Sequence, residues 1–140
     1  MSTHVEHVEH LVEEAAAAWA DYERDRSADR FAAVSLLLAR VLDSPLLGAM
    51  PIARRAEILE DAAGCFYAHF DTSGDVSALR RCVEIRRRLL AELPRDWPGR
   101  LPQLRLTGQV LLRLWAATGE ESDRVEALRL LREGDAPGFT

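Results

Sequence analysis

The sequence predicts an all-α fold of six helices arranged as three antiparallel hairpins. Apolar residues recur every three or four positions along most of the chain, no stretch alternates as a strand would, and the intervening loops are mostly short. In addition, residues 55–75 repeat loosely 45 positions later as residues 100–120, with an arginine at the start, apolar residues at helical spacing and a glycine near the end. A fixed period of this size is typical of stacked helical repeats.

The first hairpin is defined by two amphipathic stretches. An apolar stripe with steps of three and four runs from Val5 to Tyr22, and a second apolar stretch covers residues 28–42. Ser27 is placed to cap the second helix, and Pro45 follows its end. We therefore expect two helices joined by a short turn.

The second hairpin begins at Pro51, a residue that suits the first turn of a helix. Its first helix is expected to end at Gly74, because helices commonly exit through a left-handed glycine. The following helix is expected over residues 76–93, where Pro94 stops it.

The third hairpin is expected to start at residue 99 or 100 and to turn after residue 117. Thr118 and Glu121 have the spacing of a capping box for the last helix, which is expected to end near Gly134. Together the six helices predict a single domain of residues 1–140, with hairpins at about 4–43, 51–93 and 99–134.

The composition is that of an ordinary globular chain, with 48% hydrophobic and 29% charged residues. No stretch approaches the roughly 20 apolar residues that cross a bilayer, and the first residues lack the pattern of a signal peptide, so we expect a cytoplasmic protein with no membrane partner. All 18 basic residues are arginine and none is lysine. Because a coding bias explains that usage, arginine abundance is not by itself a sign of function.

The net charge of −5 is distributed unevenly, with −8 in residues 1–75 and +6 in residues 76–115. One interpretation of the basic segment is a solvated helix face, partly paired with Glu84 and Glu92; the other is a patch for anions or acidic peptides. The arginine usage favours the first, and an acidic chain is a poor candidate for a nucleic-acid partner. The arginines concerned are Arg80, Arg81, Arg87 and Arg88.

Small residues stand at fixed distances from prolines and from apolar residues. Ala33 precedes Pro45 by twelve positions, and Cys82 precedes Pro94 by twelve. This pattern resembles the tetratricopeptide repeat, which implies a right-handed α-solenoid in which small residues such as Gly108 let two helices approach closely. The same spacing of residue types occurs at Leu59, Ala62, Ala63 and Phe66, and again at Leu104, Thr107, Gly108 and Leu111.

The period of 45 to 49 residues exceeds the usual tetratricopeptide length of about 34. The chain is in this respect similar to long repeats of actinobacterial proteins, which often lie beside caspase-like CHAT domains. Two positions depart from the resemblance: the proline of the third hairpin falls early, at Pro137, and Arg86 stands where a large apolar residue is usual.

The resemblance also implies a concave groove lined by the first helix of each hairpin, which would bind a protein or peptide segment. When the groove positions of the family are transferred to this sequence, the groove changes from acidic residues such as Glu57 to basic residues such as Arg113. Its candidate residues are Glu57, Glu60, Gly64, Tyr67, Ala68, Pro102, Arg105, Gln109, Leu112 and Arg113.

Residues that could carry chemistry give little support for catalysis. The three histidines of residues 4–10 lie three positions apart, but the third is turned about 120° from the first on a helix, so we expect a solvated first turn and no metal. Cys65 and Cys82 have neither a C-x-x-C spacing nor a placed base, and His69 is expected to be a half-buried packing residue. No catalytic residue and no cofactor is predicted.

Three hypotheses for the function follow. The first is a non-enzymatic interaction module that binds a protein segment in the groove. The second is a self-associating protein, a homo-oligomer, in which Val125, Leu128 and Leu131 of the last helix supply the contact. The third is a small helical enzyme or ligand-binding protein with a pocket that holds Tyr67, His69 or Trp97.

Overall fold

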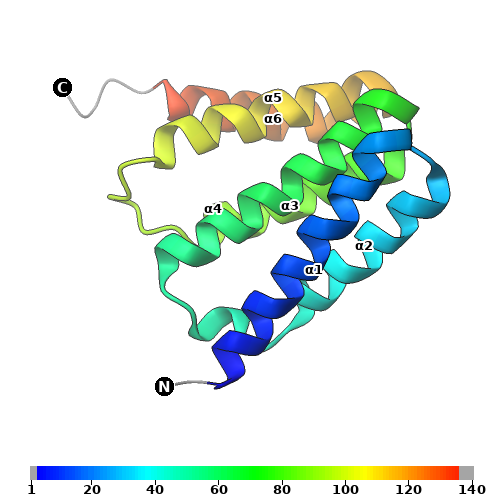
Figure 1. The fold of residues 1–140 in the computed structure, drawn as a ribbon. Helices are drawn as coiled ribbons and strands as arrows, with labels where there is room; N and C mark the ends of the chain where they lie inside the picture. Colours follow the sequence, from blue (N-terminus) through cyan, green and yellow to red (C-terminus); the bar gives the residue numbers. More distant parts are fainter. Residues whose placement is uncertain (1–2, 136–140) are drawn as a thin grey trace. The chain divides into compact units, whose positions relative to one another are not determined.

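The computed structural model describes residues 3–135 and contains six α-helices and one short 3-10 helix (Figure 1). Within those residues there is no β-strand, so the predicted all-α class is confirmed. None of the described helices is long and apolar enough to cross a membrane. The elements are α1 (Thr3–Asp25), α2 (Ala28–Asp43), η1 (Leu47–Ala49), α3 (Ile52–Ser73), α4 (Val76–Glu92), α5 (Arg100–Thr118) and α6 (Glu121–Gly134).

Most helix boundaries follow the sequence pattern closely, because a proline, a glycine or a capping side chain lies next to them. The pattern did not predict η1, in which Leu47 is fully buried and donates its N–H to the Ser44 carbonyl. Pro137, the expected proline of the third hairpin, lies outside the described residues.

The chain forms two compact units, Met1–Cys65 and Phe66–Thr140, and α3 contributes to both. In the N-terminal unit α1 packs along α2, and η1 contacts both helices. The Tyr22 and Phe31 rings, one from each helix, meet edge to face at 5.3 Å and are buried together with Val8, Val34 and Leu38. The single domain of residues 1–140 stays a prediction.

In the C-terminal unit α5 packs against both α4 and α6. A β-carbon added at Gly108 would lie 2.7 Å from Leu131 Cγ and 3.1 Å from the Ala127 carbonyl oxygen, so the expected close approach of these two helices is confirmed. Cys82 and Ala127 are fully buried as small packing residues, whereas Ala33, the corresponding residue of the first hairpin, is exposed.

The turns that follow α1, α3 and α5 share one backbone geometry. Each helix is followed directly by a residue with a left-handed φ, 56° at Arg26, 75° at Gly74 and 76° at Gly119. The predicted left-handed exit at Gly74 is therefore confirmed. In each turn the left-handed N–H donates to the carbonyl of an aromatic residue four positions earlier, Arg26 to Tyr22, Gly74 to Phe70 and Gly119 to Trp115.

The caps that follow these turns differ. Ser27 caps α2 as predicted, because its hydroxyl accepts the Arg30 N–H at 3.2 Å, and Asp75 caps α4 by accepting the Ser77 N–H at 3.0 Å. The capping box predicted from Thr118 and Glu121 is wrong. Thr118 is the last residue of α5, so its hydroxyl donates back to the Leu114 carbonyl, and α6 begins without a side-chain cap.

The arginines that open the two repeated stretches have the same structural role. Arg55 donates to the Gly48 and Met50 carbonyls in the loop before α3, at 3.1 and 2.6 Å. Arg100 donates to the Leu90 and Leu93 carbonyls at the end of α4, at 2.9 and 3.2 Å. Each guanidinium therefore ties the start of a helix to the segment that precedes it.

Candidate functional site

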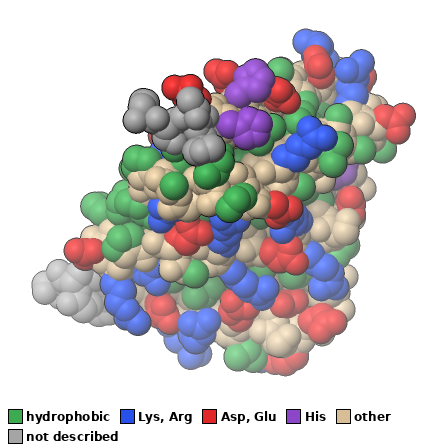
Figure 2. Space-filling view, turned by 90° about the horizontal axis from the view of Figure 1, so that it is seen from below, with side chains coloured by type: hydrophobic (Ala, Val, Ile, Leu, Met, Phe, Trp, Pro, Cys, Tyr) green, Lys and Arg blue, Asp and Glu red, His purple; other side chains and the backbone are tan. Residues whose placement is uncertain are grey.

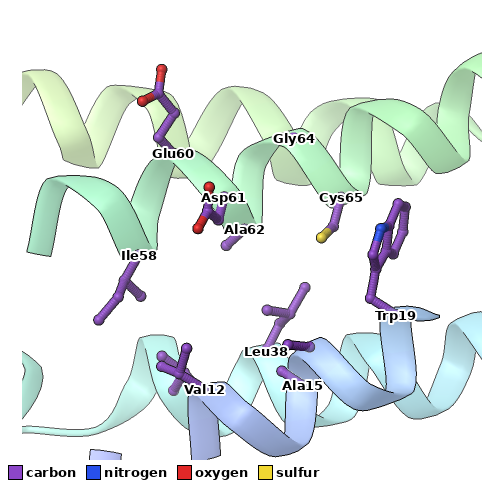
Figure 3. Close-up of a pocket in the computed structure, with 12 residues that line it drawn as sticks. Val12, Ala15, Trp19, Leu38, Ile58, Glu60, Asp61, Ala62, Gly64 and Cys65 are labelled. Carbon is purple, nitrogen blue, oxygen red and sulfur yellow. The ribbon is translucent and has the colours of Figure 1, made fainter. Parts of the chain in front are cut away.

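A pocket of about 400 Å³ lies between α1, α2 and α3, and every residue that lines it belongs to the N-terminal unit (Figure 3). Its walls are mostly apolar. Small side chains on α1 and α3 leave the space open, and larger ones close its sides. The lining residues are Val12, Ala15, Ala16, Trp19, Leu38, Val41, Ile58, Glu60, Asp61, Ala62, Gly64 and Cys65.

Asp61 supplies the carboxylate of this pocket. Figure 3 shows its side chain directed into the space between α1 and α3, whereas Glu60 on the same helix points away. Partial burial, followed by the negative charges of Glu60 and Glu57, raises the pKa of Asp61 above its ordinary value, and the charge of Arg54 opposes this. Among the described residues Asp61 has no hydrogen bond and no ion pair.

Arg54 does not neutralise Asp61 because it is engaged by other acids. Its Nε and Nη2 donate to the two carboxylate oxygens of Glu9 on α1 at 2.9 and 2.6 Å, and its Nη1 donates to Glu57 at 3.2 Å. The hydrogen bonds from Arg54 lower the pKa of Glu9, so Glu9 of α1 and Arg54 of α3 are both charged at neutral pH. The pocket carboxylate is left without a matching cation.

Neither cysteine has the environment of a nucleophile. Burial, with smaller contributions from Asp61 and Glu23, raises the pKa of the Cys65 thiol to about 12. Burial also raises the pKa of Cys82, although the charge of Arg86 and a hydrogen bond from it act in the opposite direction. Both thiols are unpaired and remain protonated at neutral pH.

Two candidate groove residues of the C-terminal unit come together on its surface. Arg113 of α5 donates to the Tyr67 hydroxyl of α3 at 3.2 Å, and its guanidinium carbon lies 5.9 Å from the Tyr67 ring centre and 5.5 Å from that of Phe70. Asp71 lies 3.8 Å from the same guanidinium. The Arg113 side chain is still 51% exposed, so this aromatic and arginine cluster is open to a partner.

The other candidate groove residues divide between the two units. Glu57 and Glu60 are exposed in the N-terminal unit, and Glu60 lines the pocket there. In the C-terminal unit Gln109 is exposed and Leu112 is half-buried. Arg105 instead donates to the Gly134 carbonyl at 2.7 Å, where it closes the end of α6.

The residues proposed from sequence for an internal pocket, Tyr67, His69 and Trp97, do not line the pocket between α1, α2 and α3. His69 is 7% exposed, more buried than expected, and its Nε2 lies 3.6 Å from an Asp75 carboxylate oxygen. Asp61 and Trp19 were not among the site residues expected from the sequence. The alanine run of residues 15–18 on α1 and the small residues 62–64 on α3 are the signals that could have indicated a gap between these helices.

The arginine face of α4 is largely paired. Arg81 contacts Glu84 at 3.1 Å and Arg88 contacts Glu92 at 2.8 Å, as the solvated-face interpretation predicts. Arg87 contacts Glu126 of α6 at 2.6 Å. Figure 2 likewise shows acidic and arginine side chains interspersed on the face in view. This pairing supports the solvated face over an anion patch.

Comparison of the chain with protein-family models, with curated proteins and with solved structures finds no match. Among the described residues, no three histidine, cysteine, aspartate or glutamate side chains are placed to hold a metal ion. The functional argument therefore depends on the geometry of the pocket and of the Arg113 cluster.

Proposed function

We propose that this chain is a non-enzymatic, cytoplasmic interaction module that binds a segment of another protein. In this proposal its hairpins are of the long tetratricopeptide-like kind, stacked with a right-handed twist, and the partner segment lies along the first helix of each hairpin. The shared turn geometry, the equivalent roles of Arg55 and Arg100 and the packing of consecutive helices support it. The two free thiols agree with a reducing compartment.

The observation that carries the proposal is the cluster of Arg113, Tyr67 and Phe70. Arginine and tyrosine are the side chains most often found at the centre of protein interfaces. Here the Tyr67 and Phe70 rings hold an exposed guanidinium in place, which reduces the entropy lost when it binds. Such a surface suits a segment in which an acidic residue is next to an apolar one.

The test is the substitution Arg113→Glu. Proteins captured by the immobilised chain are identified, the bound segment is mapped, and its affinity is measured by calorimetry. We expect Arg113→Glu to weaken binding at least about tenfold and to lower the melting temperature only slightly, because the side chain is half exposed and its contacts with Tyr67, Phe70 and Asp71 lie at the surface. Arg105 is a poor position for this test, since its bond to the Gly134 carbonyl makes substitution destabilising.

The matched control is Arg129→Glu, the same charge change on the exposed face of α6, where Arg129 pairs with Glu133 at 3.1 Å. It should bind the segment as the unmodified chain does. Equal affinity of the Arg113→Glu protein and the control would contradict the groove assignment.

The pocket favours a second candidate function, the binding of a small molecule. Its volume of about 400 Å³ and its one inward carboxylate are the features expected of a ligand site. Self-association has weaker support, because Leu131 packs against Gly108 and only Val125, 57% exposed, is open among the three residues proposed for it. A concentration-independent monomer mass in light scattering would exclude self-association.

A further inference from the structure

We propose that the pocket of the N-terminal unit binds a small amphiphilic amine, with its ammonium group at Asp61 and its apolar body between α1, α2 and α3. The proposal develops the second candidate function and does not depend on segment binding.

The size and walls of the pocket define the body of the ligand. A volume of about 400 Å³ lies within the range of about 300 to 1,000 Å³ that is typical of small-molecule sites. Apart from Asp61 and Glu60, the side chains around it are alkyl groups, the Trp19 ring and a protonated thiol. An aromatic or branched alkyl group of matching size would leave water and bury its surface there.

The charge of the pocket defines the head group. Asp61 is an exposed residue, but its side chain is directed into the pocket and has no ion-pair partner in the described part of the chain, because Arg54 is bonded to Glu9 and Glu57. An ammonium group would form an ion pair with this carboxylate. A carboxylate ligand would be repelled by Asp61, and a neutral ligand would gain no ion pair there.

Binding of this kind is reversible. The ligand forms an ion pair and apolar contacts, and the protonated Cys65 thiol contributes only packing. No bond is made or broken, so the amine is retained as bound and released unchanged.

Three probes with one apolar body test the charge requirement on the full chain. They are 4-phenylbutylamine, 4-phenyl-1-butanol and 4-phenylbutyrate, with affinities measured by calorimetry and the site located from amide shifts in NMR spectra. We expect the amine to bind at least about tenfold more tightly than the alcohol, and the carboxylate to bind least. Equal affinity of amine and alcohol, or no shift at residues 58–65, would overturn the proposal.

The substitution Asp61→Asn tests the residue. It should reduce amine affinity to that of the alcohol and leave alcohol affinity unchanged, so the alcohol also reports that the pocket is intact. The control Asp43→Asn, the same charge change at the exposed end of α2 outside the pocket, should keep the preference for the amine. A preference that survives Asp61→Asn would overturn the assignment.

A final measurement separates a free amine from a protein side chain. An acetylated and amidated Phe-Lys dipeptide carries an aromatic ring and an ammonium group within a peptide backbone. We expect it to bind more weakly than 4-phenylbutylamine. Tighter binding of the dipeptide would overturn the small-molecule assignment and give the pocket to the partner segment instead.

Discussion

At the residue scale, two glycines in similar open space should respond to alanine in opposite directions. An added β-carbon meets no atom within 4 Å at Gly119 or at Gly64, so neither substitution causes a clash. Gly119 has a φ of 76°, and a side chain there should cost about 1 kcal/mol of unfolding free energy. Gly64 lies within α3, where alanine is the better helix former by about 0.8 to 1 kcal/mol.

Urea unfolding of the two variants measures this difference. Gly119→Ala should lower the free energy of unfolding and Gly64→Ala should raise it. Shifts of the same sign would mean that cavity filling or unfolded-state effects, and not backbone conformation, decide the outcome.

Arg86 places an arginine in the packed part of α4. Its side chain donates to the Gln103 side-chain oxygen at 3.1 Å, but its Nε has no hydrogen-bond partner among the described residues, and only 6% of the residue is exposed. A buried group of this kind loses its hydration without full compensation. We expect Arg86→Met, which keeps most of the volume, to raise the free energy of unfolding by about 1 kcal/mol.

The control for Arg86 is Arg88→Met on the same helix. Arg88 is partly exposed and pairs with Glu92, so its loss should change stability by less than about 1 kcal/mol. If Arg86→Met instead lowers the free energy of unfolding, the contacts of the Arg86 guanidinium stabilise the fold by more than the cost of burying that group.

At the scale of the element, α4 is the helix whose start depends most on one charge. Asp75 accepts hydrogen bonds from the Ser77 hydroxyl at 2.6 Å and from the Ser77 N–H at 3.0 Å, and these hold the pKa of Asp75 below its ordinary value. A carboxyl with a lowered pKa contributes stability above its unfolded pKa of about 3.9 and loses that contribution as pH falls through the folded value.

Asp75→Asn keeps a capping side chain without the charge, so it isolates the pH-dependent part. Urea unfolding of both proteins over a pH series should give a difference in stability that shrinks as the pH falls below about 4. A difference that stays constant down to about pH 2 would show that the charge of Asp75 contributes nothing to the cap.

The helices could be predicted from sequence because their signals are local. Ser27, Gly74 and Pro94 each act on the backbone within a few residues, and all three act as expected. The capping box failed because Thr118 lies in the last turn of α5, where its hydroxyl donates to the Leu114 carbonyl and accepts only the Glu120 N–H, so α6 begins without a side-chain cap. Asp75 follows a left-handed glycine and caps α4, although the sequence pattern was not used to predict a cap at that position.

At the scale of the whole molecule, the pocket could not be predicted because it depends on three helices from distant parts of the sequence. Two alanines of α1, Ala15 and Ala16, line the pocket together with Leu38 of α2 and Ile58 of α3, and no periodicity within one helix indicates this arrangement. The pairing of Tyr67 with Arg113 is different. These residues lie 46 positions apart, close to the repeat period, so the internal repeat brought them into one candidate set and the structure places them in contact.

The cluster of Arg113, Tyr67 and Phe70 shares no residue with the pocket, so the effects of Arg113→Glu and of Asp61→Asn should be separable. In the double variant Asp61→Asn/Arg113→Glu, we expect loss of amine preference equal to that of Asp61→Asn alone and loss of segment affinity equal to that of Arg113→Glu alone. Asp61→Asn should also raise the melting temperature slightly, because it removes a carboxylate whose pKa is raised by burial and by Glu60. Calorimetry with 4-phenylbutylamine and with the mapped segment measures both affinities on one sample. If bound amine changes segment affinity, the coupling free energy between the sites is not zero, and the chain would be a ligand-controlled adaptor rather than a protein with two independent sites.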